Sequence, residues 1–180
     1  MKINGQIGAP EWTVIVGSCG FIVVLALSAI WQADIRWLHF LQAWMYLATI
    51  QLTLRHNRWG YFIGVSAAGL WDLINLVATT FFRNGMAELL AVLRTGHSTR
   101  PDQLIAVFAW LSNALVVGGC GWAYGRLRTK AVGDTAKFVT AFAATTAFFA
   151  ADMMLFQPRY LSLLVRLVHP SQWLIPWRFS

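Results

Sequence analysis

Long apolar runs separated by short polar segments dominate the sequence. Five of these runs have about the 20 residues, within a range of about 17–25, that a helix needs to cross the hydrocarbon core of a bilayer. Because lipid offers the backbone no hydrogen-bond partner, runs of this length are expected to be helices. The pattern predicts an all-α, polytopic membrane helical bundle of about five transmembrane helices. The predicted spans are 12–31, 37–54, 59–82, 104–124 and 138–157.

Two further apolar segments are too short or too interrupted to span a membrane comfortably. Residues 86–94 can wind as a short amphipathic helix, with leucines on one side. Residues 161–179 mix leucines and tryptophans with Arg166 and Pro170. A segment with one apolar face and basic or aromatic residues beside it is typical of a helix that lies in the membrane interface. We therefore predict one or two interfacial helices, and a single integral membrane domain over residues 1–180. A sixth span within 161–177 is the alternative.

The composition excludes several other classes of protein. The chain is 58% apolar and 12% charged, whereas soluble domains are about 45–50% apolar and about 25% charged. A soluble fold of this size would have to expose large apolar patches, which are rare on soluble proteins. The 14 Lys and Arg residues against 7 Asp and Glu residues give a net charge of +7. Most of the arginines lie singly between apolar runs and form no basic face, so we expect no nucleic-acid partner.

The basic residues of the short loops predict the orientation. Cytoplasmic loops of membrane proteins carry an excess of Lys and Arg. The loops after the second and fourth runs are basic, and they lie on the same side as the N-terminus. The basic residues of that side are Lys2, Arg55, Arg58, Arg126, Arg128, Lys130 and Lys137. We expect a multi-pass protein of a cell inner (plasma) membrane with a cytoplasmic N-terminus.

Asp72 is the most informative polar residue, because it interrupts the third apolar run. A carboxylate near the middle of a span costs about 2.5–3.5 kcal/mol on insertion scales, so such a residue normally faces protein or water. Gly60, Gly64 and Ala68 precede Asp72 at intervals of four residues. Small residues at this spacing allow another helix to approach closely. Asp72 is therefore predicted to point into the bundle, on the face that packs against other helices.

Polar residues of four runs fall at a similar depth. With a rise of about 1.5 Å per residue, these side chains lie roughly 2–6 Å outward of the centres of their spans. We interpret this layer as a polar pocket or pathway open towards the outer side, with Asp72 as an interhelical hydrogen bond as the alternative. The candidate ligand-binding residues are Asp72, Asn75, Asn113, Gln42 and Asp152.

The other motifs predict packing and no chemistry. Gly121 and Gly125 form a second pair of small residues, predicted to pack against the alanine-rich fifth run. The glycines lack the Lys-Ser/Thr that a phosphate-binding loop requires. No histidine pair has the spacing of metal ligands on a helix, and no nucleophile–base or paired-carboxylate pattern is visible. We therefore predict no metal site and no catalytic residues. A cofactor stays undetermined.

Residues 55–93 carry a resemblance to a known family. An Asn-Arg-Trp turn at 57–59 enters a glycine-containing span, which leads to a short amphipathic segment. This arrangement resembles one repeat region of the nicotinamide riboside permeases. The resemblance covers about a fifth of the chain and implies small-molecule transport, without assigning a role to any residue.

Two hypotheses of function follow. The first is a small transporter or permease-like subunit with an intramembrane polar site around Asp72, acting as a homo-oligomer or with partner membrane subunits. The second is an accessory or structural subunit of a larger membrane complex, for example an energy-transducing one, in which Asp72 forms an interhelical hydrogen bond. A membrane-embedded enzyme acting on lipid is a third, less favoured class.

Overall fold

The chain folds as an all-α bundle, seen here in a computed structural model that describes residues 7–127 and 131–172. No β-strand occurs within these two ranges. The long helices coincide with the predicted spans, so the predicted fold class is confirmed. The helices are α1 (Ala9–Trp31), α2 (Arg36–Leu54), α3 (Arg58–Leu73), α4 (Phe81–Thr95), α5 (Pro101–Gly125), α6 (Asp134–Phe156) and α7 (Leu161–Leu167). The short helical turns are η1 (Ala33–Ile35), η2 (Ile74–Ala78, π-helical), η3 (Pro158–Tyr160) and η4 (Pro170–Gln172).

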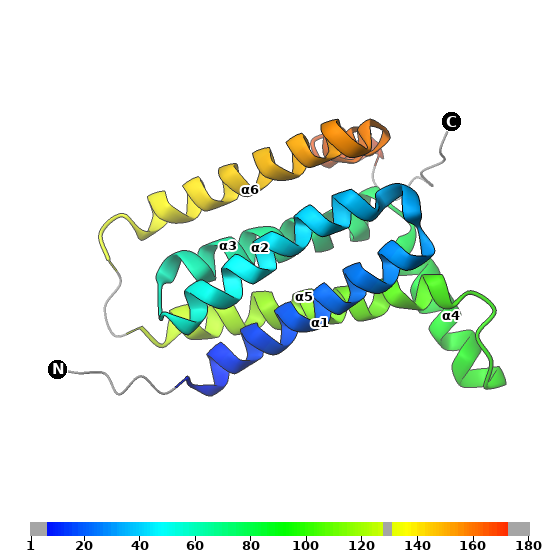
Figure 1. Cartoon of the computed structure of the whole chain (residues 1–180), viewed down its shortest axis with the longest axis horizontal. Helices are drawn as coiled ribbons and strands as arrows, with labels where there is room; N and C mark the ends of the chain where they lie inside the picture. Colours follow the sequence, from blue (N-terminus) through cyan, green and yellow to red (C-terminus); the bar gives the residue numbers. More distant parts are fainter. Residues whose placement is uncertain (1–6, 128–130, 173–180) are drawn as a thin grey trace.

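The long helices, namely α1, α2, α3, α5 and α6, run side by side along the long axis of the molecule (Figure 1). The α1 helix packs most extensively against α5, and α2 and α3 complete a four-helix group with them. The α6 helix packs mainly on α3, on the far side of this group from α1. The α4 helix leaves the bundle at the end where α1 finishes and α2 begins, and it is inclined to the other helices (Figure 1).

Four helical segments are long and apolar enough to cross a membrane: Ala9–Trp31, Arg58–Ala78, Pro101–Gly125 and Asp134–Phe156. The fifth predicted span, 37–54, lies in α2, whose 19 residues are about 28 Å long by the rise of an α-helix. Residues such as His39 and Gln42 lower the hydropathy of α2 below that of the other four. Its place in the bundle therefore depends on packing against α1 and α3 as well as on its apolar residues.

The predicted uninterrupted span over 59–82 is wrong at its C-terminal end. The α-helical hydrogen bonding of α3 stops at Leu73, and the five residues of η2 form a π-helical turn. Thr79 then adopts an extended backbone, with φ −122° and ψ 177°, and α4 begins two residues later. The carbonyl oxygen of Ala78 accepts a hydrogen bond of 2.8 Å from the Arg166 guanidinium. This bond gives a partner to a backbone group that the break in the helix exposes.

An interfacial segment over 161–179 would leave the Arg166 side chain at the membrane surface, but the side chain does not lie at the surface of the bundle. The side chain is buried and reaches from α7 into the bundle, where α7 packs against η2. A buried guanidinium needs such an acceptor because its desolvation is otherwise unfavourable. Residues 173–180 of the predicted interfacial segment lie outside the described residues. The other predicted interfacial segment, 86–94, lies in α4, where Leu90 and Leu93 are exposed.

Small residues set the closest helix approaches, at some of the predicted positions. A Cβ added at Gly60 would lie 2.9 Å from the backbone nitrogen of Thr53 on α2. A Cβ at Gly64 would lie 2.8 Å from both the Cys120 sulfur and a methyl group of Thr49. Ala68, next on the same stripe, is fully buried.

The close packing predicted at Gly121 and Gly125 is not present. Both glycines are exposed, and an added Cβ at either would meet no described atom within 4 Å. The close contact on α5 is at Gly119, where a Cβ would lie 2.9 Å from the backbone nitrogen of Val14. On α1 the matching position is Gly17, whose added Cβ would lie 2.7 Å from the carbonyl oxygen of Ser112. The α5 helix therefore packs against α1 through the face that carries Gly119. Gly121 and Gly125 lie on another face of α5.

Candidate functional site

A cavity of about 400 Å³ opens in the bundle near α4. Its wall is built by residues of α1, α2, η2, α5, α6 and α7, together with the start of α4. By the topology of the chain this is the end opposite the loops that carry Arg55, Arg58 and Arg126. Two of the predicted ligand-binding residues, Gln42 and Asn75, line the cavity.

The polar atoms deep in the cavity come from α2 and η2. Gln42 is only 4% exposed, and its Oε1 atom has no hydrogen-bond partner among the described residues. The Nδ1 atom of His39, three residues earlier on the same helix, likewise has none in that part of the chain. Asn75 donates from Nδ2 to the Trp71 carbonyl oxygen at 2.9 Å. Buried polar atoms normally have partners, so Gln42 and His39 are suited to receive a bound molecule or water.

The π-helical turn of η2 places Asn75 and Thr79 on the cavity wall. A π-helical turn within an α-helix is rare and is frequently found at functional sites. The Thr79 hydroxyl donates to the backbone carbonyl of Asn75 at 3.1 Å, and the Phe81 backbone N–H donates to the same hydroxyl at 3.2 Å. These two bonds connect η2 to the start of α4 across the break. The sequence contains no glycine or proline there to predict the break.

An aromatic cluster lies behind the cavity. Trp71, which lines the cavity, packs edge-on against Phe21 with ring centroids 5.0 Å apart. Phe21 in turn packs on Tyr46 at 4.5 Å. Phe21 and Tyr46 are fully buried and do not line the cavity. The cluster therefore joins the cavity wall to the next layer of the core.

Asp72 and Asn113 lie in that layer and do not line the cavity. The Tyr46 hydroxyl donates to Asn113 Oδ1 at 2.9 Å, and Asn113 Nδ2 donates to Asp72 Oδ1 at 3.2 Å. This chain joins α2, α5 and α3. The predicted residues are thus divided between two neighbouring places, the cavity and a hydrogen-bonded interhelical contact.

Asp152 is separate from both. It is 2% exposed on α6, and neither of its carboxyl oxygens has a hydrogen-bond partner among the residues described. It does not line the cavity, although its neighbour Met153 does. The predicted depth of Asp152 along its span could not give the direction of its side chain, which is buried here away from the cavity.

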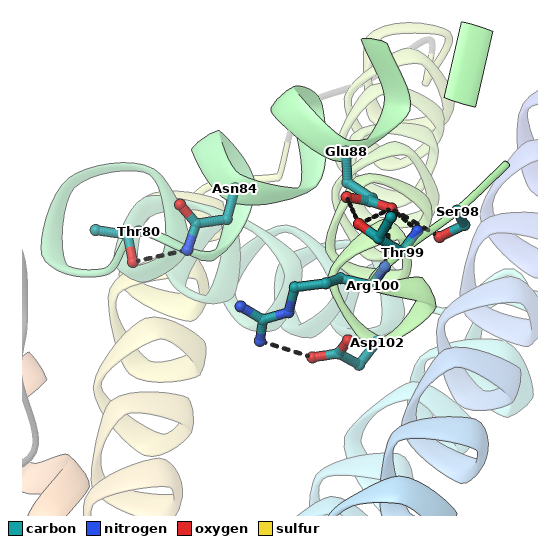
Figure 2. Close-up of polar contacts among 7 residues, drawn as sticks. All are labelled: Thr80, Asn84, Glu88, Ser98, Thr99, Arg100 and Asp102. Atoms are coloured by element: carbon teal, nitrogen blue, oxygen red, sulfur yellow. Dashed lines mark hydrogen bonds and ion pairs between the residues drawn. The ribbon is translucent and has the colours of Figure 1, made fainter. Parts of the chain in front are cut away.

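At the exposed edge of the cavity, here called its mouth, the lining residues from the starts of α4 and α5 include the polar side chains drawn in Figure 2. Asn84 of α4 donates to the Thr80 hydroxyl at 3.3 Å. At the start of α5 the Arg100 guanidinium forms an ion pair with Asp102 at 3.4 Å. All four of these residues line the cavity. The exposed edge of the cavity therefore carries charged and amide groups.

Glu88 holds the connection between α4 and α5 beside this mouth (Figure 2). Its Oε1 atom accepts hydrogen bonds from the Ser98 hydroxyl at 2.9 Å and from the backbone N–H groups of Thr99 at 2.6 Å and Arg100 at 2.9 Å. The amphipathic pattern of residues 86–94 does not indicate this role of Glu88. The run Ser98-Thr99-Arg100 before Pro101 is the sequence signal that could have indicated a docked turn.

We expect the turn of Ser98, Thr99 and Arg100, which is bound to Glu88 and is here called the docked turn, to persist below pH 4.5. The hydrogen bonds from the Arg100 backbone, the Ser98 hydroxyl and Thr99 lower the pKa of Glu88 from its ordinary value of 4.5. A carboxyl group with a lowered folded pKa stabilises the folded state above its unfolded pKa, and the contribution is lost as the pH falls through the folded pKa. The amide resonances of Thr99 and Arg100 should therefore shift with a midpoint below 4.5. The Glu88→Gln variant should show no such transition, and a midpoint at or above the ordinary value would contradict the docked carboxylate.

Two ion pairs tie connections to the bundle elsewhere. Asp134, buried at the start of α6, accepts from Arg58 at 2.7 Å and from the Tyr124 hydroxyl at 3.2 Å. At the cavity end, Arg159 forms an ion pair with Asp34, which joins η1 to η3. These contacts fix loop positions and leave the cavity open.

Within the described ranges, no three His, Cys, Asp or Glu side chains lie together in a way that could hold a metal ion. Comparison of the chain with protein-family models, with curated proteins and with solved structures finds no match. The resemblance of residues 55–93 to the permeases therefore receives no support from these comparisons.

Proposed function

We propose that this chain is a small transporter or permease-like membrane protein that binds a small molecule in the cavity near α4. The observation that carries the proposal is the buried Gln42 side chain, which lines a cavity of about 400 Å³ and whose Oε1 atom has no hydrogen-bond partner in the described chain. Cavities with a largely apolar wall and a few polar groups are the usual form of small-molecule sites. The break at Thr79 supports the proposal, because interrupted helices line the binding sites of many transporters.

The proposed setting is a cell inner membrane with the N-terminus in the cytoplasm. The basic loops after α2 and α5 support this orientation. It places the cavity at the outer side, where α1 ends. A bundle of this size would act with membrane lipid around it, as a homo-oligomer or with partner membrane subunits.

A substitution that fills the cavity tests the proposal. Ala106 lines the cavity, so Ala106→Trp should occupy it, whereas Ala151→Trp on the exposed side of α6 is the matched control. Detergent-purified protein is screened against a panel of small polar molecules by thermal unfolding. A ligand at 100 times its Kd should stabilise the wild type by about 2.7 kcal/mol.

The expected result is a compound that stabilises the wild type and Ala151→Trp but leaves Ala106→Trp unchanged. The same compound should enter proteoliposomes that contain the wild type. If no compound in the panel distinguishes the two variants, the cavity is not a ligand site and the proposal fails.

The second candidate is an accessory subunit of a larger membrane complex. It is supported by the exposed aromatic row of α2, in which Trp37, Phe40 and Trp44 pack edge-on at 6.0 and 6.3 Å. The hydrogen bond between Asn113 and Asp72 also suits an interhelical role for the aspartate. A stoichiometric partner that co-purifies in mild detergent, together with an unchanged protein in the ligand screen, would favour this function over transport.

A further inference from the structure

We infer that the molecule bound in the cavity has an aliphatic body and an uncharged hydrogen-bonding group, such as a primary amide, at its inner end. This inference rests on the proposed function and adds the chemical class of the ligand. It follows from three features of the wall, namely the unpartnered polar atoms deep in the cavity, the position of the charged side chains and the nature of the apolar surface between them.

The inner polar atoms require hydrogen-bonding groups on the ligand. A carbonyl oxygen that is buried without a donor is unfavourable, and a ligand that supplies the donor removes this cost. Gln42 Oε1 is such an oxygen, and the imidazole of His39 lies one helical turn away on the same wall of the cavity. The Gln42 amide and the His39 ring can each donate or accept. A group that does both, such as an amide, matches them best.

Permanent charges lie only at the mouth. Of the described residues that line the cavity, Arg100 and Asp102 alone carry a permanent charge, and both lie at the start of α5. Ala109, further along α5 on the same wall, lies about 10 Å deeper by the rise of a helix. An ion placed beside Gln42 would lose its hydration without gaining a counter-ion of fixed charge. The inner end of the ligand is therefore uncharged.

Apolar atoms make up the larger part of the cavity surface, and many of them belong to aliphatic side chains. A molecule that spans from the mouth to Gln42 must cross this surface, and a hydrocarbon body gains the most from burial there. Phe149 and Tyr160 add aromatic surface near the same end of the bundle. The aliphatic lining residues include Val24, Leu25, Leu38, Ile74, Ile105 and Leu163.

Three probes of one chain length separate the classes: pentanamide, pentanoate and pentylammonium, each titrated at neutral pH into the detergent-purified protein. The wild type should bind pentanamide at least tenfold more tightly than either ion. Gln42→Met keeps the size of the side chain but removes the amide, and it should weaken pentanamide about tenfold. Gln51→Met makes the same change at an exposed position of the same helix and should have no effect. Ala106→Trp should abolish binding of pentanamide.

The outcomes distinguish the ligand class from the function. Tighter binding of either ion, abolished by Ala106→Trp, would overturn the uncharged class and leave the proposed function standing. The same conclusion holds if another compound of the panel responds to Ala106→Trp and pentanamide does not. If no compound responds, both proposals fail. If Gln42→Met does not fold, the ligand class is still decided by two results. These are the order of the three affinities in the wild type and the loss of pentanamide binding in Ala106→Trp.

Discussion

Gly17→Ala is expected to destabilise the bundle by about 1–3 kcal/mol, the cost of overpacking a well-packed contact. An added Cβ would lie 2.7 Å from the Ser112 carbonyl oxygen and 2.9 Å from the Val116 backbone nitrogen. Both are backbone atoms of α5, so no side-chain rotation can relieve the clash. The α1 and α5 helices form the largest helix contact in the molecule and would have to separate. Thermal unfolding of the purified protein in detergent measures the effect.

Gly121→Ala is the matched control for this prediction. The position lies within α5, and an added Cβ would meet nothing described within 4 Å. Because alanine favours a helix over glycine by about 1 kcal/mol, this variant should be as stable as the wild type or slightly more stable. Equal losses in Gly17→Ala and Gly121→Ala would show that the α1–α5 contact is not the close approach described here.

Asn113→Ala should have the second large effect, because it removes the central member of the chain that links Tyr46 to Asp72. The Tyr46 hydroxyl loses its acceptor at 2.9 Å and Asp72 loses its donor at 3.2 Å. Leaving the fully buried Tyr46 hydroxyl without its partner costs about 1–3 kcal/mol, and the half-buried Asp72 carboxyl adds a smaller loss. The removed side chain also leaves a void, since Asn113 is fully buried. The loss should appear as a lower unfolding temperature in detergent.

Asp72→Asn tests the role of the carboxylate in the same chain. The amide oxygen can still accept from Asn113, so the loss of stability should be below about 1 kcal/mol. Ligand binding in the cavity should persist, because Asp72 does not line it. Loss of ligand binding with unchanged stability would contradict the interhelical role and would show that Asp72 takes part in ligand binding. Asn84→Ala, at the half-exposed contact with Thr80, serves as the control for removing an asparagine side chain.

The sequence predicted a common depth for the candidate residues but gave no direction for their side chains. A rise of about 1.5 Å per residue predicts similar heights for Gln42, Asp72, Asn113 and Asp152 without any tertiary information. Their grouping depends on how each helix is rotated about its own axis. Rotation is set by packing, and here Gly17 and Gly119 turn α1 and α5 towards each other. Gln42 and Asn75 then face the cavity, while Asn113 is turned towards Tyr46 and Asp72.

The apolar runs by themselves determined that this chain is a bundle of long helices with the composition of a membrane protein, because run length and the need to pair the backbone leave few other structures for them. The spacing of Gly60, Gly64 and Ala68 also indicated one packing face. Only the tertiary structure decided that the third run breaks at Thr79 and that Arg166 reaches its freed backbone. It also decided which polar residues share the cavity. These features depend on contacts between residues far apart in the chain, and such contacts leave no local pattern in the sequence.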